Sequence, residues 1–353
     1  MGTNEKPQWT SSIEYASGET LMTQGADALH EHVASLYETA LGKSLPQMEV
    51  RVNDLSINAE MFVAKEEDMH KTQELPTLVN TVKQALGRLH AKKHSVTKHV
   101  LRHVSATFKP GTMTLILGQP GSGKSALMKA IAGRFPMTHN IKMEGEITYN
   151  GISRPTLLHR LAQMVGYVPQ RDVHFPTMTP KETFEFAHAC CGGGLLPNAE
   201  ELFSHASHEG TQRAMAVGRA LEQHYPDVMI RQLGLDNCQH TIVGNAMIRG
   251  VSGGERKRVT TGEMLFGDKN VMLFDEISTG LDSAATYDIV KTQRSLVKKL
   301  HRTVVMALLQ PPPEVFSLFD NVLMLDQGHV IYHGPREGIV EYISFRIERE
   351  TLS

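Results

Sequence analysis

The sequence predicts an α/β fold built on a largely parallel sheet, and three features of the chain lead to that prediction. Apolar strands and longer helical segments alternate from Thr112 to about Gly334, as they do when helices cover a parallel sheet. One strand, residues 113–117, runs into a glycine-rich turn and a helix. Another, residues 271–274, ends on Asp275 and Glu276. Ligands of such sheets usually sit at the carboxyl ends of the strands, so these two strand ends are the main candidates for a site.

The composition is compatible with an ordinary globular protein. The 353 residues suffice for one large α/β domain, or for a catalytic domain with a smaller one attached. The formal net charge of -2 does not favour a nucleic-acid binder. The three cysteines (Cys190, Cys191 and Cys238) form no CxxC pair, which favours a reduced, cytosolic setting. No run approaches the roughly 18 apolar residues of a membrane span, so we expect the chain as given to be soluble.

Residues 1–45 are expected to form a polar segment that contains one short amphipathic helix. Residues 1–24 are polar, and we expect them to be poorly ordered. From Gly25 to Leu41 the spacing predicts a helix, because apolar residues recur every three or four positions. These apolar residues are Leu29, Val33, Leu36, Tyr37 and Ala40.

The next part of the chain is expected to form an antiparallel β-subdomain. Apolar residues alternate around Asn53-Asp54, which indicates a β-ribbon there, and residues 75–89 have the pattern of a helix ending near Gly87. Four histidines then follow at spacings that would suit one face of a helix: His90, His94, His99 and His103. The intervening residues favour strand, and no carboxylate or Cys supports a metal site, so a solvated strand pair is the preferred interpretation.

A helical subdomain, at roughly residues 175–260, is predicted to be inserted into the α/β core. Residues 190–212 contain a glycine cluster and have little hydrophobic period, which is typical of a loop. Residues 213–235 have the composition and pattern of a helix.

The glycine-rich turn has the sequence of a phosphate-binding P-loop. Its glycines let successive N–H groups face phosphate oxygens, and the helix that follows adds its positive end. Lys124 would neutralise the β- and γ-phosphates, and the Ser125 hydroxyl would bind Mg²⁺. The predicted nucleotide-binding residues of this loop are Gly118, Gln119, Pro120, Gly121, Ser122, Gly123, Lys124, Ser125 and Ala126.

The strand that ends on Asp275 supplies a second half of the site. A carboxylate at such a strand end beside a P-loop is where a Mg²⁺-bound water is held. Glu276 could orient or deprotonate the attacking water. An Asp-Glu pair after an apolar run is common by itself, so its weight comes from the motifs around it.

Those motifs resemble the nucleotide-binding domain of ABC transporters. "YVPQ" ends at Gln170, "VSGGERKRV" starts at Val251, and "STGLDSA" contains Asp282, so the Walker A, Gln loop, signature, Walker B and Asp loop occur in the order of that family. The segments "VSGGERKRVTTGEML" and "DEISTGLDSA" are most similar to the G subfamily, and within it to the pleiotropic drug resistance type. The resemblance covers about residues 46–342 and implies a P-loop NTPase of the ABC type.

The resemblance implies that two such domains sandwich two ATP molecules head to tail. Glu276, Gln170 and Lys124 would be catalytic, and Ser125, Gln170 and Asp275 would hold Mg²⁺. The signature would contact the ATP held by the partner domain, since "VSGG" is predicted to open a helix whose N–H groups can bind a γ-phosphate. The residues predicted to act there are Ser252, Gly253, Gly254, Glu255 and Asp282. Arg256, Lys257 and Arg258 are equally well interpreted as a solvated helix face.

One residue departs from the family pattern. Most ABC ATPases carry a histidine that touches the γ-phosphate at the end of the strand after the Asp loop, and "ALLQPPPE" places Leu309 there. Losing a hydrogen bond to a charged group costs about 1.5–3 kcal/mol, or roughly ten- to hundredfold in rate. First-half domains of the drug-resistance type also lack this histidine. No adenine-stacking aromatic is evident, and His94 and His99 are weak candidates.

Three functions are therefore compared. The first is an ATP-hydrolysing motor for export of small, hydrophobic compounds, and the second is a nearly non-hydrolytic ATP-binding module whose signature completes the partner's site. The third is a non-transport ABC ATPase, which is less compatible with the G-type sequence "DEISTGLDSA". We expect a fragment, residues 343–353 being a short tail, rather than a separate ATPase subunit. Its transmembrane domain would lie outside this chain and hold it at the cytoplasmic face of a membrane.

Overall fold

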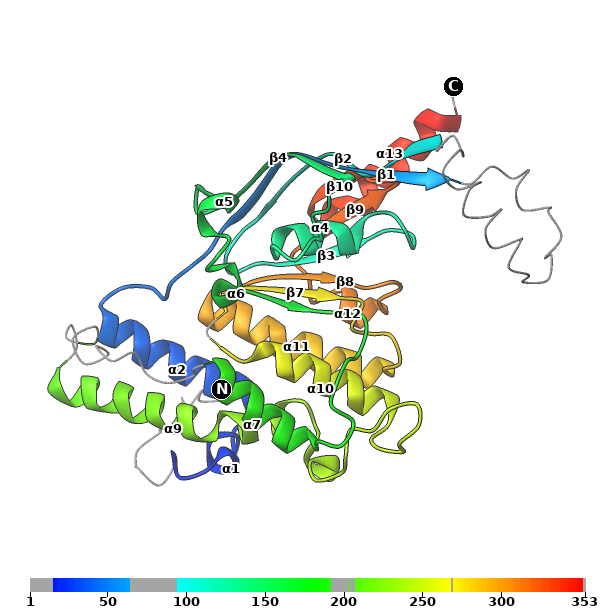
Figure 1. Ribbon diagram of the computed structural model, residues 1–353. Coiled ribbons are helices and arrows are strands. Elements are labelled where there is room, and N and C mark those ends of the chain that lie inside the picture. Colours follow the sequence, from blue (N-terminus) through cyan, green and yellow to red (C-terminus); the bar gives the residue numbers. More distant parts are fainter. Residues whose placement is uncertain (1–14, 64–93, 192–202, 204–206, 268, 352–353) are drawn as a thin grey trace.

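A six-stranded, largely parallel sheet forms the centre of the protein, as predicted (Figure 1). The structure is a computed structural model that describes residues 15–63, 94–191, 203, 207–267 and 269–351. The strand order is β10-β9-β3-β8-β7-β6, and only β10 runs antiparallel to its neighbour among these strands. The bounds are β3 Met113–Leu117, β6 Val165–Val168, β7 Val271–Asp275, β8 Thr303–Ala307, β9 Asn321–Asp326 and β10 His329–Pro335.

A second, four-stranded sheet is antiparallel and has the order β2-β1-β4-β5. Its bounds are β1 Val50–Val63, β2 His94–Phe108, β4 Ile141–Tyr149 and β5 Ile152–Ser153. Helix α4 (Lys124–Ile131) lies between this sheet and the parallel sheet (Figure 1), and its buried residues join both sheets in one apolar core. The P-loop helix is thereby fixed on two sides.

The other face of the parallel sheet is covered by helices (Figure 1). Helices α10 (Gly253–Leu265) and α11 (Ser283–Leu300) lie against it, and α7 (Pro180–Cys191) and α9 (His208–Gln232) extend from it. A second apolar core includes Phe184 of α7, Phe274 of β7 and Val290 of α11. The remaining short elements are α5 Arg154–Leu157, α6 Leu161–Met164, η3 Asp236–Cys238, α12 Pro313–Phe316 and η4 Arg336–Gly338.

The amino-terminal segment is more ordered than predicted. The helix expected from Gly25 to Leu41 is confirmed as α2, with the same bounds. The expectation that residues 1–24 lack order is wrong for the described part, because α1 (Gly18–Leu21) buries Leu21 completely. Helix α1 packs against α9, and α2 packs against both α9 and α11. Burial of apolar side chains against α9 and α11 stabilises a segment whose sequence is largely polar.

The β-ribbon predicted around Asn53-Asp54 is instead one continuous strand. The register of β1 shifts between residues 52 and 58 in its pairing with β2 and between residues 53 and 56 in its pairing with β4, and Asp54 has a positive φ of 51°. A bulge of this kind changes which face the side chains occupy without ending the strand. The expected helix at residues 75–89 and His90 lie outside the described residues, whereas His99 and His103 lie on β2 as predicted.

Helix boundaries differ from the expectation in three places. Helix α9 begins at His208, inside the segment expected to be a loop, and Ser207 caps it by accepting a hydrogen bond from the Gly210 N–H. Helix α10 runs to Leu265, past the expected limit of the helical subdomain. Helix α13 (Ile339–Thr351) continues through the expected tail. In the described part of the chain, no helix is long and apolar enough to cross a membrane.

Candidate functional site

The carboxyl ends of four parallel strands bring the predicted site residues to one edge of the sheet. Ala307 of β8 is level with Ile116 of β3 on one side and with Asp275 of β7 on the other. The next strand, β6, ends at Val168, which is level with Phe274 of β7. The P-loop, Gln170, Asp275 and the residues after β8 therefore leave the sheet at the same level.

The P-loop needs glycine where the chain turns most sharply. Gly118 has a φ of 153°, and a Cβ there would lie 2.3 Å from the Leu325 carbonyl oxygen. Gly123 has a φ of 105°, and its Cβ would lie 2.6 Å from a methyl group of Leu101. Helix α4 begins at the next residue, so its free N–H groups face the loop.

Lys124 folds back over this loop. Its side chain is 3% exposed, and its Nζ donates hydrogen bonds to the carbonyl oxygens of Gly118 (2.8 Å) and Gln119 (3.0 Å). The same Nζ lies 3.6 Å from Oε1 of Glu276. The ammonium group thus lies between the loop and the catalytic carboxylate predicted from the sequence. Ser122, also in the loop, has a buried Oγ without a hydrogen-bond partner in the described structure.

Ser125 and Asp275 are in direct contact, and a third residue joins them. The Ser125 Oγ donates to Oδ1 of Asp275 at 2.9 Å, and the Tyr167 hydroxyl donates to Oδ2 at 2.7 Å. Burial, and then the hydrogen bond to Asp275, raise the pKa of Tyr167 above its usual range. The hydroxyl therefore keeps its proton and acts as a donor. Sequence reasoning missed Tyr167, although it lies in the "YVPQ" segment that identified Gln170.

Glu276 is held in a strained backbone conformation. It has a φ of 52°, unusual for a residue other than glycine, and its N–H donates to the Ala307 carbonyl at 3.0 Å. The Gln170 Nε2 donates to its Oε2 at 2.6 Å. Because the residue is only 8% exposed, the carboxylate is oriented by its neighbours rather than by solvent.

The signature residues begin a helix, as predicted, but away from this group. Ser252 caps α10: its Oγ accepts from the Glu255 N–H at 3.2 Å, while its own N–H donates to Oε2 of Glu255 at 2.7 Å. Gly253 and Gly254 form the first residues of α10. Asp282 caps α11 by accepting from the Ala285 N–H at 2.7 Å. Among the described residues, no hydrogen bond or ion pair connects these signature residues or Asp282 to Lys124, Ser125, Asp275 or Glu276.

The interpretation of the basic residues after the signature as a solvated face is wrong for Lys257, whereas Arg256 and Arg258 are partly exposed. Lys257 is 2% exposed, forms an ion pair with Asp172 at 2.7 Å and donates to the Gln170 carbonyl oxygen. Arg256 and Arg258 donate to the backbone carbonyls of Val243 and Leu233. Lys257 thus packs on the loop that carries Gln170, a contact that the sequence pattern does not reveal.

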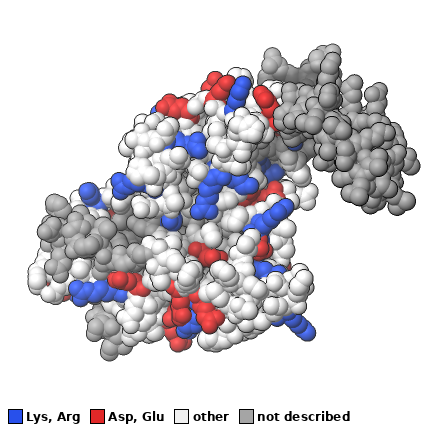
Figure 2. Space-filling model, in the orientation of Figure 1, with Lys and Arg blue, Asp and Glu red and all other residues white. Residues whose placement is uncertain are grey.

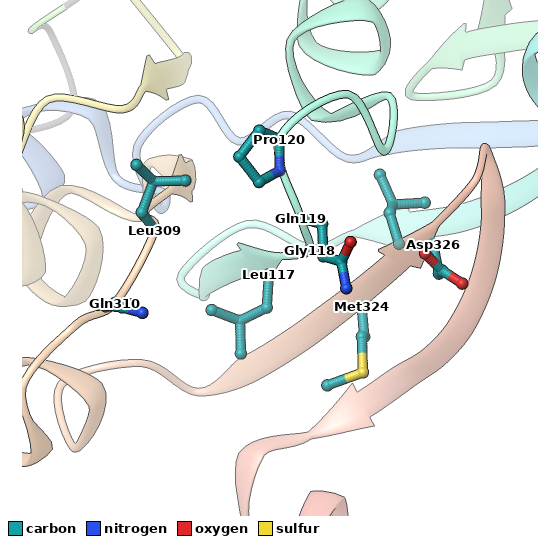
Figure 3. Close-up of a pocket in the computed structure, with 9 residues that line it drawn as sticks. Leu117, Gly118, Gln119, Pro120, Leu309, Gln310, Met324 and Asp326 are labelled. Carbon is teal, nitrogen blue, oxygen red and sulfur yellow. The ribbon is translucent and has the colours of Figure 1, made fainter.

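Leu309 lies beside the P-loop. It follows the end of β8 by two residues and is 42% exposed, so the strand stops earlier than the apolar run in the sequence. A pocket of about 700 Å³ opens here (Figure 3), with Leu309 and Gln310 on one side, Met324 and Asp326 on the other and the P-loop between them. Its full lining is Leu117, Gly118, Gln119, Pro120, Leu309, Gln310, Met324, Leu325 and Asp326. The pocket is thus mainly apolar beside Leu309.

The donors available to a metal ion are oxygen atoms. Ser125 and Asp275 provide a hydroxyl and a carboxylate within hydrogen-bond distance of each other, which fits Mg²⁺, an ion that takes few protein ligands together with phosphate and water. In the described residues, no group of three or more His, Cys, Asp or Glu side chains could form an all-protein metal site.

Lys, Arg, Asp and Glu side chains are interspersed on the face drawn in Figure 2.

Comparisons with known proteins agree with this geometry. A sequence model described as "ABC transporter" matches residues 101–279, about half of the chain. "ABC transporter G family member 48" of Oryza sativa subsp. japonica is 41% identical over 315 residues, which are 86% of this chain and 21% of that protein. "ABC transporter G family member 31" of Arabidopsis thaliana is 39% identical over 328 residues, 87% of this chain and 22% of that protein. The chain spans about a fifth of the length of these relatives.

Solved structures show the same fold. The ATP-binding cassette MJ0796, in a dimeric post-hydrolysis state bound to ADP and Pi, matches with a TM-score of 0.51 and 19% identity over 81% of this chain and 98% of that chain. A second dimeric structure of that bacterial cassette matches with a TM-score of 0.51 and 17% identity over the same shares. The P-loop NTPase fold of the ABC type is thereby confirmed.

Proposed function

The chain belongs to the ABC transporter family, and from that premise we propose that it binds and hydrolyses ATP to power export of small, hydrophobic compounds through a transmembrane domain. The observation that carries the proposal is the convergence of Lys124, Asp275 and Glu276 at one sheet edge. These residues supply a cation for phosphate, a carboxylate for Mg²⁺ and a base for water.

ATP would replace internal contacts of the P-loop. The Lys124 Nζ would exchange the carbonyl oxygens of Gly118 and Gln119 for phosphate oxygens, and the N–H groups at the start of α4 would bind the same phosphates. Mg²⁺ would take the Ser125 hydroxyl as a ligand, with Asp275 and Gln170 close to it. Glu276, oriented by Gln170, would then accept a proton from the attacking water.

A second nucleotide-binding domain would complete the site. Ser252, Gly253 and Gly254 lie at the start of a helix but do not contact Lys124 or Glu276 of their own chain, which is expected if they serve the ATP of a partner in a head-to-tail sandwich. We propose that Asp282, which caps α11, acts at the same interface. Because two sites need two domains, turnover by the isolated chain should be low.

An apolar surface on the helical part fits a transmembrane domain. Val173, Phe175 and Phe186 are 81%, 70% and 57% exposed and line one small pocket with Met178. Val173 and Phe175 follow Gln170 by only a few residues, so a partner seated on this surface could influence the catalytic carboxylate through Gln170. Exposed apolar patches of this kind mark interaction sites.

A second candidate function is a nearly non-hydrolytic ATP-binding module. Leu309 favours it, because an apolar side chain beside the P-loop cannot donate a hydrogen bond to a γ-phosphate. In that case the site binds Mg·ATP and turns over slowly, while the signature at Ser252 serves the partner's faster site. The experiment below separates binding from turnover.

The proposal is tested with a fluorescent ATP analogue and the purified chain. Lys124→Ala should weaken nucleotide binding at least about tenfold, because a charge-assisted contact to phosphate contributes ~1.5–3 kcal/mol. Lys129→Ala is the matched control, since Lys129 lies on the same helix but in its last turn. Equal affinities of the two variants would contradict ATP binding at the P-loop.

Hydrolysis is measured after the partner domain is added. The binding-module alternative is supported if the site on this chain turns over slowly and if Ser252→Ala in this chain lowers turnover at the partner's site but not at its own. Fast turnover that Glu276→Gln abolishes supports the motor.

A further inference from the structure

We propose that Tyr167 is a positioning residue for the Mg²⁺ of this site: its hydroxyl fixes the orientation of the Asp275 carboxylate that would hold the metal. The inference rests on the proposed ATPase function but concerns a residue to which the sequence analysis assigned no role. Tyr167 is 4% exposed and Asp275 is 1% exposed, so neither side chain is oriented by solvent.

The register of the sheet explains how the contact arises. Tyr167 is level with Leu273 on the neighbouring parallel strand, and Asp275 lies two residues further along that strand. Residues two apart on a strand point to the same face, so the tyrosine ring runs diagonally across β7 and places its hydroxyl at the carboxylate. The 2.7 Å distance between the hydroxyl oxygen and Oδ2 is that of a charge-assisted hydrogen bond.

The tyrosine ring itself is held in place. It belongs to the apolar core that joins α4 to both sheets, and the Arg134 guanidinium lies 5.9 Å from the ring centroid on the ring face. A ring fixed in this way directs its hydroxyl without further loss of side-chain entropy. The hydroxyl can therefore act as a rigid support for a group that must bind a metal.

The two donors on Asp275 divide its oxygen atoms between them. Ser125 donates to Oδ1 and Tyr167 donates to Oδ2, so the carboxylate plane cannot rotate without breaking one of these bonds. The Ser125 oxygen keeps lone pairs for Mg²⁺ while its O–H donates to Oδ1. Without the tyrosine hydroxyl, one buried carboxylate oxygen would lose its donor and the carboxylate could turn away from the metal.

The experiment is a Mg²⁺ titration of ATP-analogue binding by the purified chain. Tyr167→Phe removes only the hydroxyl, and partners that orient metal ligands typically contribute 10–100-fold to metal affinity. We expect the Mg²⁺ concentration at half-maximal effect to rise about tenfold, while affinity for the analogue in EDTA is unchanged. The electron paramagnetic resonance spectrum of the bound Mn²⁺·nucleotide should also change in Tyr167→Phe, because the oxygen ligands of the metal become less ordered.

Tyr149→Phe is the matched control. Tyr149 is 1% exposed, lies in the same apolar core and donates its hydroxyl to the Ile131 carbonyl at the end of α4, away from Asp275. It should lower stability without changing the Mg²⁺ titration. Equal titration midpoints for Tyr167→Phe and the unchanged protein would overturn the inference, as would an equal shift in both variants. If Mg²⁺ does not affect nucleotide binding by the unchanged protein, the proposed function itself fails.

Discussion

Nε2 of Gln170 lies 2.6 Å from Oε2 of Glu276 and donates a hydrogen bond to it, although the two residues are 106 positions apart in the sequence. Glu276 is held on its other side by the Lys124 ammonium at 3.6 Å, and its backbone has a positive φ. The carboxylate that should activate water is thus fixed by strain and by two polar neighbours. Residues in such backbone conformations persist where the surrounding structure determines them, often at functional sites.

The strain at Glu276 predicts an unusual order of stabilities. Glu276→Gly should be more stable than Glu276→Ala by about 1 kcal/mol, because a positive φ costs a residue with a Cβ roughly that much and costs glycine nothing. At an ordinary helix or strand position the order would be reversed. Urea unfolding of the two variants measures the difference. A higher stability of the alanine variant would show that the φ of 52° carries no strain.

The ion pair between Lys257 and Asp172 is expected to stabilise the protein more than a surface pair does. Lys257→Met should lower the free energy of unfolding by about 2–3 kcal/mol, because Asp172 keeps its charge and loses its cation. Arg213→Met in the exposed pair with Glu209 is the control and should cost less than about 0.5 kcal/mol. Chemical denaturation gives both values.

The role of the Lys257 contact in the site can be separated from its role in stability. Lys257 also donates to the Gln170 carbonyl, so Lys257→Met should disturb the contact between Gln170 and Glu276. We expect a lower hydrolysis rate with the partner domain present and little change in nucleotide affinity. A loss of affinity equal to the loss of rate would point to general unfolding instead.

Leu309→His should raise hydrolysis in the presence of the partner domain. A histidine on the edge of the pocket beside Gly118 could donate to a γ-phosphate, and that hydrogen bond is worth about 1.5–3 kcal/mol, or roughly ten- to hundredfold in rate. Leu309→Met keeps the position apolar and should leave the rate unchanged. Steady-state phosphate release measures both variants. No increase for Leu309→His would mean that this position does not control turnover.

The local motifs were predictable because each depends on residues that are close together in the sequence. The strand at residues 113–117, the helix that Ser252 caps and the helix from Gly25 to Leu41 depend on neighbouring residues, and the structure confirms each. The contact between Tyr167 and Asp275 was not predictable, because it depends on which strands are neighbours and on their register. A sequence pattern does not contain either.

Burial of charge was the other point at which sequence reasoning failed. Three consecutive basic residues are usually solvated, and Lys257 is buried only because Asp172, 85 positions earlier, lies opposite it. The β-ribbon expected around Asn53-Asp54 is one continuous strand for a related reason, since pairing with strands on both sides continues through a bulge. In both cases tertiary contacts override the local preference.

A buried polar cluster beneath the amino-terminal helix gives a prediction for pH. The Ser295 hydroxyl donates to Asp27 at 2.7 Å, so His30 must donate from Nδ1 to Ser295 Oγ at 3.0 Å and accept at Nε2 from the Gln232 amide at 3.2 Å. This arrangement uses the neutral form of the imidazole, because a second ring proton would face the amide donor. The cluster joins α2 to both α11 and α9.

Burial lowers the pKa of His30 from 6.5 to about 4, against the opposing effect of Asp27. The unfolded chain therefore binds a proton below pH 6.5 that the folded protein does not, and stability falls as the pH drops from 6.5 toward 4. The loss attributable to His30 should reach about 2 kcal/mol at pH 5. The other charged groups near this cluster are Asp27 and the ion pair of Glu31 and Lys299.

His30→Gln isolates the contribution of the imidazole, because glutamine keeps donors and an acceptor but does not titrate. Urea unfolding at pH 7.5 and pH 5 should show a smaller loss of stability on acidification for this variant than for the unchanged protein, by about 2 kcal/mol. All remaining titrating groups act equally in both proteins and cancel in the comparison. Identical losses would mean that His30 accepts its proton in the folded state, and that the hydrogen bonds at Ser295 and Gln232 do not hold it neutral.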